Sequence, residues 1–349
     1  MIARSDAAVQ TIPAQQLSVC CWQQQLRDAI TDPGELIRRL QLPTGLLDEI
    51  DGATRSFPLR VPEAYLRRIR RGDPHDPLLL QVLPQGRETD PVQGYTQDPL
   101  GEAQANPVEG VIHKYHGRLL LIVSGGCAIN CRYCFRRHFP YADNQLGGAA
   151  WQRVLSYLAA DASVEEVILS GGDPLATPDQ RLAGMLRDLE QIPHLRRLRI
   201  HSRLPVVIPD RVTPALTGML RASRLQTLLV THINHPNEID PAVADALARL
   251  AASGTRLLNQ TVLLRGINDQ VSILKALSEA LFEQGVMPYY LHLLDPVAGA
   301  AHFDLGERES RALVGRLAAQ LPGYLVPQLV REQAGALAKV PLAALIPGA

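Results

Sequence analysis

Short apolar runs alternate with longer amphipathic segments from about residue 119 towards the C-terminus. Six apolar runs have the length and composition of buried β-strands, near residues 119–124, 164–170, 196–203, 225–233, 256–264 and 287–294. Six segments with helical periodicity lie between and after them, near residues 145–160, 178–191, 211–222, 241–253, 270–285 and 306–320. Because parallel strands need long crossover connections, this alternation predicts repeated βα units and a parallel sheet.

The number of βα units limits the architecture. Six units are too few to close the usual eight-stranded barrel, so the sequence predicts an α/β fold built as a partial, open, TIM-like βα barrel. We expect this barrel at residues 111–322 and a separate C-terminal segment at 323–349. Functional residues should lie at the carboxyl ends of the strands, as they do in barrels of this type.

A helical N-terminal lobe and a wrapping segment are expected before the barrel, at residues 1–110. Helical spacing covers residues 15–30 and 35–40. The following stretch to residue 110 is rich in Pro, Gly and Asp, so regular structure should be sparse there. Cys20 and Cys21 lie in the first helical stretch and are most simply small buried hydrophobic residues without a role.

The composition of the chain argues against several classes of protein. Lys plus Arg and Asp plus Glu number 35 each, so no net field favours nucleic acid or an anionic membrane, and a small-molecule substrate fits better. No apolar run reaches the roughly 18 residues that span a bilayer, and the chain start lacks the apolar core of a signal peptide. The few cysteines fit a reducing compartment, and we expect a cytoplasmic protein.

Three of the five cysteines follow the first predicted strand directly. Cys127, Cys131 and Cys134 have CxxxCxxC spacing. Three soft ligands on one loop can hold a 4Fe-4S cluster and leave one iron open, whereas a further ligand such as His138 would complete a zinc site. With Tyr133 before the third cysteine, the motif resembles the radical S-adenosylmethionine (SAM) superfamily. There SAM binds the open iron and is cleaved to a 5'-deoxyadenosyl radical.

A glycine pair follows the second predicted strand, in the run Ser170-Gly171-Gly172-Asp173-Pro174. The glycines allow the backbone to approach a ligand closely, and the proline fixes the exit of the turn. Alone, this run is an ordinary βα turn. Beside the cysteine triplet it resembles the GGxP element of the radical SAM superfamily, which binds the amino group of SAM.

Polar residues occur at further strand ends and near the C-terminus. His232, Gln260 and Asp295 each follow or end a predicted strand, where a histidine or an acid can also serve as an ordinary cap or a solvated side chain. At an open barrel's mouth Asp295 can pair with a substrate ammonium. Arg136 suits bidentate capture of a carboxylate, and Lys339, between apolar neighbours, can be a reactive buried amine.

Together these segments resemble the lysine 2,3-aminomutase family of radical SAM enzymes. The family's segments occur in order over about residues 75–341, at 97–102, 113–115, 127–137, 170–174, 231–236, 259–269 and 288–295. Their number and order are more specific than the cysteine triplet alone.

The resemblance implies three cofactors, a 4Fe-4S cluster on the three cysteines, SAM and pyridoxal 5'-phosphate (PLP). Residues that would surround SAM are Gly171, Gly172, His232 and Gln260. Lys339 corresponds to the lysine that binds PLP covalently, although residues 333–338 replace the family's glycine-rich approach. Lys114 and Arg118 fall where relatives carry basic groups near the PLP phosphate.

The resemblance also implies a substrate site. Arg136 matches the arginine that binds the substrate carboxylate, and Asp295 matches one of two aspartates that hold the side-chain ammonium of lysine. The second aspartate is missing, and we place Arg331 at its position, where a positive charge would oppose an ammonium. This departure, a short N-terminal region and a chain end soon after Lys339 resemble the branch that makes (R)-β-lysine for modification of elongation factor P.

The implied activity is a PLP-dependent isomerisation of L-lysine, with the nitrogen moving from C2 to C3 and SAM regenerated. This activity would need a reductant such as flavodoxin or ferredoxin, and it is compatible with a homo-oligomer. A separate ligase would attach β-lysine to elongation factor P without direct contact between the factor and this protein. Two alternatives stay open. One is a catabolic or osmolyte-producing aminomutase acting on lysine or on glutamate, whose carboxylate Arg331 could accept; the other is an iron-sulfur electron-transfer or redox-sensing protein.

Overall fold

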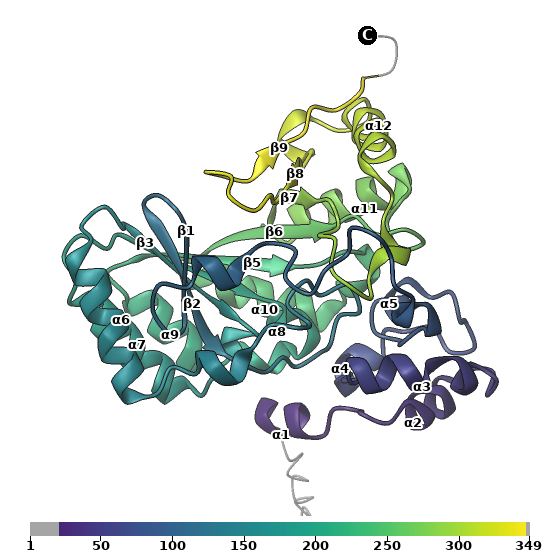
Figure 1. Cartoon of the computed structure of the whole chain (residues 1–349), viewed down its shortest axis with the longest axis horizontal. Helices are drawn as coiled ribbons and strands as arrows, with labels where there is room; N and C mark the ends of the chain where they lie inside the picture. Colours follow the sequence, from purple (N-terminus) through teal and green to yellow (C-terminus); the bar gives the residue numbers. More distant parts are fainter. Residues whose placement is uncertain (1–20, 347–349) are drawn as a thin grey trace, which may run out of the picture.

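The computed structural model describes residues 21–346 and contains one nine-stranded sheet (Figure 1). Its strands lie side by side in sequence order: β1 (Val111–Tyr115), β2 (Arg118–Ser124), β3 (Glu166–Gly171), β4 (Arg197–Ser202), β5 (Gln226–His232), β6 (Arg256–Val262), β7 (Met287–His292), β8 (Gln328–Arg331) and β9 (Val340–Pro341). Strands β2 to β8 are parallel, and β1 and β9 pair antiparallel at the two edges. The sheet is therefore an open arc, which confirms the predicted partial barrel.

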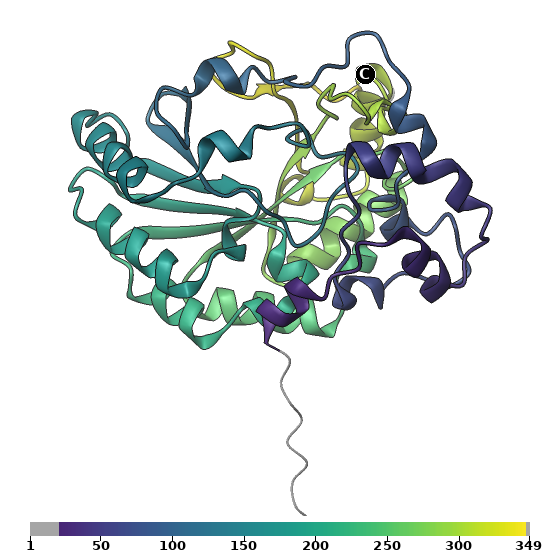
Figure 2. The same ribbon diagram turned by 60° about the horizontal axis from the view of Figure 1, so that its bottom comes forward.

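Helices connect the parallel strands and cover the outer side of the arc (Figure 2). The helices are α1 (Trp22–Arg27), α2 (Pro33–Leu40), α3 (Leu46–Ser56), α4 (Glu63–Leu66), α5 (Pro77–Leu80), α6 (Gly148–Ala160), α7 (Asp179–Glu190), α8 (Leu204–Val207), α9 (Pro214–Ala222), α10 (Pro241–Ala252), α11 (Val271–Glu283) and α12 (Glu307–Ala318). Helices α1 to α4 gather on one side of the sheet in both views, and α4 contacts α8. The segment between α4 and β1 has only short helices, as predicted.

Burial explains why six strands and six helices could be predicted, with ends that differ by only a few residues. Strand β3 is buried at every residue and has three consecutive apolar residues at its centre, while β4 alternates between buried and half-buried positions. The two edge strands, β1 and β9, and the neighbouring strand β8 were not predicted. Each is short or contains polar residues, and its strand conformation depends on pairing with a neighbour.

Side-chain caps set where several helices begin. The Asp32 carboxylate accepts hydrogen bonds from the backbone N–H groups of Gly34 and Glu35, so α2 begins at Pro33, earlier than the predicted start at residue 35. Thr213 and Asp240 cap α9 and α10 in the same way. These caps fix the connections between strands, and with them the loops at the sheet's carboxyl edge.

Two N-terminal predictions need correction. The first helix ends at Arg27 rather than continuing to residue 30, because Ile30 leaves the helix to form a β-bridge with Val61. Cys21 is exposed, not buried, and Cys20 lies outside the described residues.

The structure tests the predictions about domain boundaries and membrane spans only in part. Strands β8 and β9, from the segment placed at 323–349, continue the sheet of the barrel, and the boundaries at residues 110 and 322 stay a prediction. No helix between residues 21 and 346 is long and apolar enough to cross a bilayer.

Candidate active site

Twelve of the residues singled out from the sequence line one cavity of about 620 Å³. The cavity lies at the carboxyl ends of the parallel strands, and its wall includes Lys114, Arg118, Cys127, Cys131, Cys134, Arg136, Gly171, Gly172, His232, Gln260, Asp295 and Lys339. Its volume falls in the usual range of ligand sites. The parallel sheet thus brings together residues that are more than 200 positions apart in the sequence.

The three cysteines lie on the loop between β2 and α6, and their thiols are free. The guanidinium groups of Arg132 and Arg137, next to the cysteines, pair with Glu88 at 2.6 Å and 2.9 Å in the protein interior. Removing one partner from such a buried network leaves an uncompensated charge, so this arrangement holds the loop firmly. Burial raises the pKa of the Cys134 thiol to about 11, so its thiolate needs a cation beside it, which a bound metal supplies.

The cysteine arrangement fits a cluster better than a zinc ion. In the described part of the chain, no group of three or more His, Cys, Asp or Glu side chains is arranged to hold a metal ion. A 4Fe-4S cubane takes each thiolate at a different iron, so three cysteines on one loop can hold it. His138, the proposed fourth zinc ligand, instead hydrogen-bonds the backbone carbonyl of Ala298 through Nε2 at 3.2 Å.

The glycine pair packs directly against the cysteine loop. The backbone N–H of Gly172 donates to Ser124 O at 2.7 Å, and the N–H of Asp173 donates to Gly126 O at 2.9 Å. A Cβ on Gly172 would lie 2.5 Å from Gly126 O, and Gly171 has φ of +112°. Both positions therefore require glycine. The turn and the cysteine loop form a single backbone surface facing the cavity.

His232 is a neutral side chain in this cavity. It ends β5 and lies beside Gln260 of β6 in the parallel register. Burial, and then the nearby Arg203 guanidinium, lower the pKa of His232 to about 3. Its Nε2 lies 2.9 Å from the hydroxyl of Tyr133, and the two rings stack with centroids 5.6 Å apart. His232 can therefore offer a hydrogen bond to a ligand without adding charge.

Arg136 is held by Glu102, a residue to which the sequence assigned no role. Its Nε and Nη2 donate to the two carboxylate oxygens at 2.8 Å and 2.7 Å, and its Nη1 donates to Ser170 Oγ at 3.1 Å. Burial opposes the charge of this guanidinium, but Glu102 more than offsets the effect and raises the pKa of Arg136. The arginine is thus a fixed cation whose Nη1 has no carboxylate partner.

Glu332, which the sequence reasoning missed, lies where Arg331 was expected. The Arg331 side chain is exposed and pairs with Glu307 at 3.0 Å, so placing it at the substrate site was wrong. Glu332 lines the cavity and contacts the ammonium groups of Lys114, at 3.2 Å, and Lys339. Adjacent strand residues point to opposite faces, so an error of one position placed the outward residue at the site instead of the inward one.

Asp295 and Glu332 form an unequal pair of carboxylates. Burial, and then the negative charge of Glu332, raise the pKa of Asp295 to about 7. Burial also opposes the charge of Glu332, but Lys339 and Lys114 lower the pKa of Glu332 to about 2. Near neutral pH Glu332 is charged, whereas Asp295 is partly protonated.

The cavity also offers groups suited to a phosphorylated aromatic cofactor. The chain has three lysines, Lys114, Lys275 and Lys339, and the first and last of these line the cavity. Arg118 lies among them, with its guanidinium 4.7 Å from the centroid of the Tyr115 ring. The buried Nε2 atoms of two cavity histidines, His201 and His292, have no hydrogen-bond partner within residues 21–346. Such atoms are stable only when a ligand or water pairs with them, so these residues fit PLP.

Comparison with known proteins agrees with this geometry. The model of the radical SAM superfamily matches residues 121–276. The L-lysine 2,3-aminomutases of Haemophilus influenzae and Escherichia coli are 51% and 52% identical to this chain, over 90% and 92% of its length and 93% and 94% of theirs. The L-lysine 2,3-aminomutase of Clostridium subterminale is 34% identical, over 92% of this chain and 77% of its own.

The similarity thus extends over nearly the whole chain. The chain belongs to the lysine 2,3-aminomutase family of radical SAM isomerases.

Proposed function

We propose that this protein converts L-lysine to (R)-β-lysine, and that the product is used to modify elongation factor P. Membership of the family implies a 4Fe-4S cluster, SAM and PLP. The observation that carries the proposal for lysine is the pair of carboxylates, Asp295 and Glu332, in the same cavity as Lys339 and the three cysteines.

The cofactors would divide the cavity between them. Cys127, Cys131 and Cys134 would hold the cluster, and Gly171, Gly172, His232 and Gln260 would surround SAM. Lys339 would carry PLP, with Lys114 and Arg118 near its phosphate. When bound, the cluster and SAM supply a radical that abstracts hydrogen, and PLP supplies a π-system through which nitrogen can migrate.

The side-chain end of the substrate would meet Glu332 and Asp295. The ammonium of Lys339 already contacts Glu332, which shows that a lysine ammonium fits against this carboxylate. If Lys339 carried PLP, Glu332 would keep its contact with Lys114 and lose the one with Lys339, which leaves a place for the substrate ammonium. A cation there would also favour the charged form of Asp295. Two carboxylates in the cavity wall can then select a substrate with a second ammonium.

The carboxylate end of the substrate would meet Arg136. This guanidinium is positioned by Glu102 and Ser170, so it need not change rotamer when substrate binds. Fixing both ends of lysine holds its C3 in one place relative to the radical. The protein's contributions are therefore placement of C3 and exclusion of other hydrogen donors from the cavity.

The proposed use of β-lysine to modify elongation factor P rests on the resemblance of the sequence to the branch of the family that serves this modification. The chain is more similar to the E. coli and H. influenzae relatives than to the clostridial one. Arg331 does not support the assignment to this branch, because its side chain faces away from the cavity. For the same reason, the alternative of glutamate as substrate loses the residue that suggested it.

Product stereochemistry tests the proposal. The cluster-reconstituted, reduced protein is incubated anaerobically with SAM, PLP and L-lysine, and β-lysine is resolved on a chiral column. We expect (R)-β-lysine, and we expect a purified elongation factor P with its ligase to accept it. The (S) product would indicate a catabolic or osmolyte-producing enzyme, and SAM cleavage without β-lysine would reject lysine as the substrate.

A further inference from the structure

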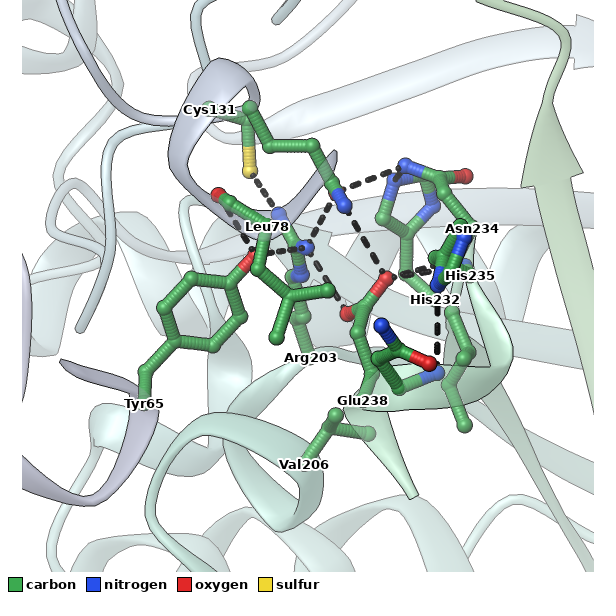
Figure 3. A network of polar contacts seen from close by, with 12 residues as sticks. Tyr65, Leu78, Cys131, Arg203, Val206, His232, Asn234, His235 and Glu238 are labelled. Carbon is green, nitrogen blue, oxygen red and sulfur yellow. Dashed lines mark hydrogen bonds and ion pairs between the residues drawn. The ribbon is translucent and has the colours of Figure 1, made fainter. Parts of the chain in front are cut away.

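Arg203 lies between Cys131 of the cysteine loop and the buried carboxylate of Glu238 (Figure 3). It directly follows β4 and is 6% exposed. Its Nη1 donates to Cys131 Sγ at 2.7 Å and to the Tyr133 hydroxyl at 2.9 Å. Its Nη2 donates to Gln81 Oε1 at 2.6 Å and to Glu238 Oε2 at 2.9 Å. The sequence patterns gave no role to this residue.

Hydrogen bonds fix both the backbone of Arg203 and the carboxylate of its partner, Glu238. Asp173, next to the glycine pair, accepts hydrogen bonds from the backbone N–H groups of Arg203 and Leu204 at 2.8 Å and 2.9 Å. Glu238 is fully buried and accepts backbone N–H groups of Asn234 and His235 at 2.8 Å and 3.1 Å. Loops after three neighbouring strands thus hold the guanidinium in one position beneath a cysteine sulfur.

A buried cation in hydrogen-bond contact with a cluster sulfur affects the chemistry of the cluster. Reduction adds one negative charge to a cluster, so a nearby positive charge and a hydrogen bond to a ligating sulfur favour the reduced form. Glu238 lies farther from the sulfur on the opposite side of Arg203 and opposes this effect. Arg203 and Glu238 therefore have opposite effects on the reduction of the cluster.

We propose that Arg203 is a positioning residue for the cluster, which orients Cys131 and makes the cluster easier to reduce, while Glu238 limits that effect. The inference rests on the proposed cluster at the three cysteines, and it does not depend on lysine as the substrate. The step involved is transfer of one electron from an external low-potential reductant to the oxidised cluster, with no bond made or broken.

The test measures the cluster's reduction potential without SAM, PLP or lysine. Full-length protein is reconstituted with iron and sulfide, and the reduced cluster is quantified by electron paramagnetic resonance at a series of poised potentials. In Arg203→Met we expect the ratio of reduced to oxidised cluster at a fixed potential to fall at least tenfold, equal to about 59 mV for one electron. In Glu238→Gln we expect a shift in the opposite direction.

A matched control separates this role from a structural one. Arg211 is also fully buried, but its partners are Leu175, Thr177 and Asp179, so Arg211→Met should lower stability and leave the potential unchanged. If Arg203→Met does not fold, Glu238→Gln decides by the sign of its shift. Clusters with unchanged potentials in both variants would overturn the inference. A wild-type protein that binds no cluster would instead overturn the proposed function, and the inference with it.

Discussion

The ammonium of Lys339 contacts the carboxylate of Glu332, seven residues earlier in the chain. The pair lies between the residue proposed to carry PLP and the site proposed for the substrate's own ammonium. Lys114 contacts the same carboxylate from β1, so the two cavity lysines share one acid. Cofactor attachment to Lys339 would therefore remove one of these two ammonium groups from Glu332 and leave a place for the ammonium of the substrate.

Lys339→Ala should abolish activity and the absorbance of lysine-bound PLP while the cluster remains. The reason is that covalent attachment needs an amine, and the cysteines belong to a different loop. Absorption spectra and iron content check both parts. Lys275→Ala, on α11 away from the cavity, is the matched control and should keep both. Retention of the PLP absorbance by Lys339→Ala would show that another group binds the cofactor.

Glu332→Gln should raise the KM for L-lysine by about tenfold or more, because a charge-assisted hydrogen bond in a buried site is lost. Steady-state kinetics with saturating SAM and PLP measure the effect. Arg331→Gln is the neighbouring control and should leave KM unchanged, since Arg331 pairs with Glu307 on the outside. An equal rise in both variants would argue that the segment as a whole was disturbed and that Glu332 has no special role.

Asp295 should make the protein without ligands less stable as pH rises. The pKa of Asp295 in the folded protein is about 7, above its ordinary value of 3.8. Between these two values the folded state binds more protons than the unfolded state, so the free energy of unfolding falls with pH, by about 1.4 kcal/mol per pH unit at most. Asp295→Asn should remove this slope, so the variant gains stability over wild type from about pH 4 to 7.

Chemical denaturation at a series of pH values measures that slope in the two proteins. The same titration has a consequence for binding. The charged form of Asp295 prevails above about pH 7, so affinity for L-lysine should weaken as pH falls through this value in wild type but not in Asp295→Asn. Parallel stability curves for the two proteins between pH 4 and 7 would contradict the assignment.

Gly172→Ala should prevent stable loading of the cluster and cost about 1–3 kcal/mol of stability. The added Cβ would lie 2.5 Å from the carbonyl oxygen of Gly126, so the cysteine loop must move. Iron content after reconstitution and thermal unfolding measure the two effects. Gly184→Ala, in the middle of α7 with open space at its Cβ, should be neutral or slightly stabilising. Normal cluster loading in Gly172→Ala would show that the loops can separate without loss.

The sequence by itself determined the parts of this protein that depend on local periodicity and short motifs. Strand β3 could be predicted because every residue in it is buried, and α2 because Asp32 and Pro33 mark its start. The three cysteines and the glycine pair were visible because each lies within a few residues of chain. Parallel strands end at one edge of a sheet, so their alternation also indicated that these motifs meet in one cavity.

Tertiary structure alone decided which neighbours complete the site. Glu102 and Glu332 have no local signal, because an acid becomes functional here only through the cation that long-range folding places beside it. Whether Arg331 or Glu332 faces the cavity depends on the register of β8 against β7, which two apolar residues in a four-residue strand could not specify. The contact of Arg203 with Cys131 spans 72 positions, and only the meeting of separate loops at the carboxyl edge of the sheet creates it.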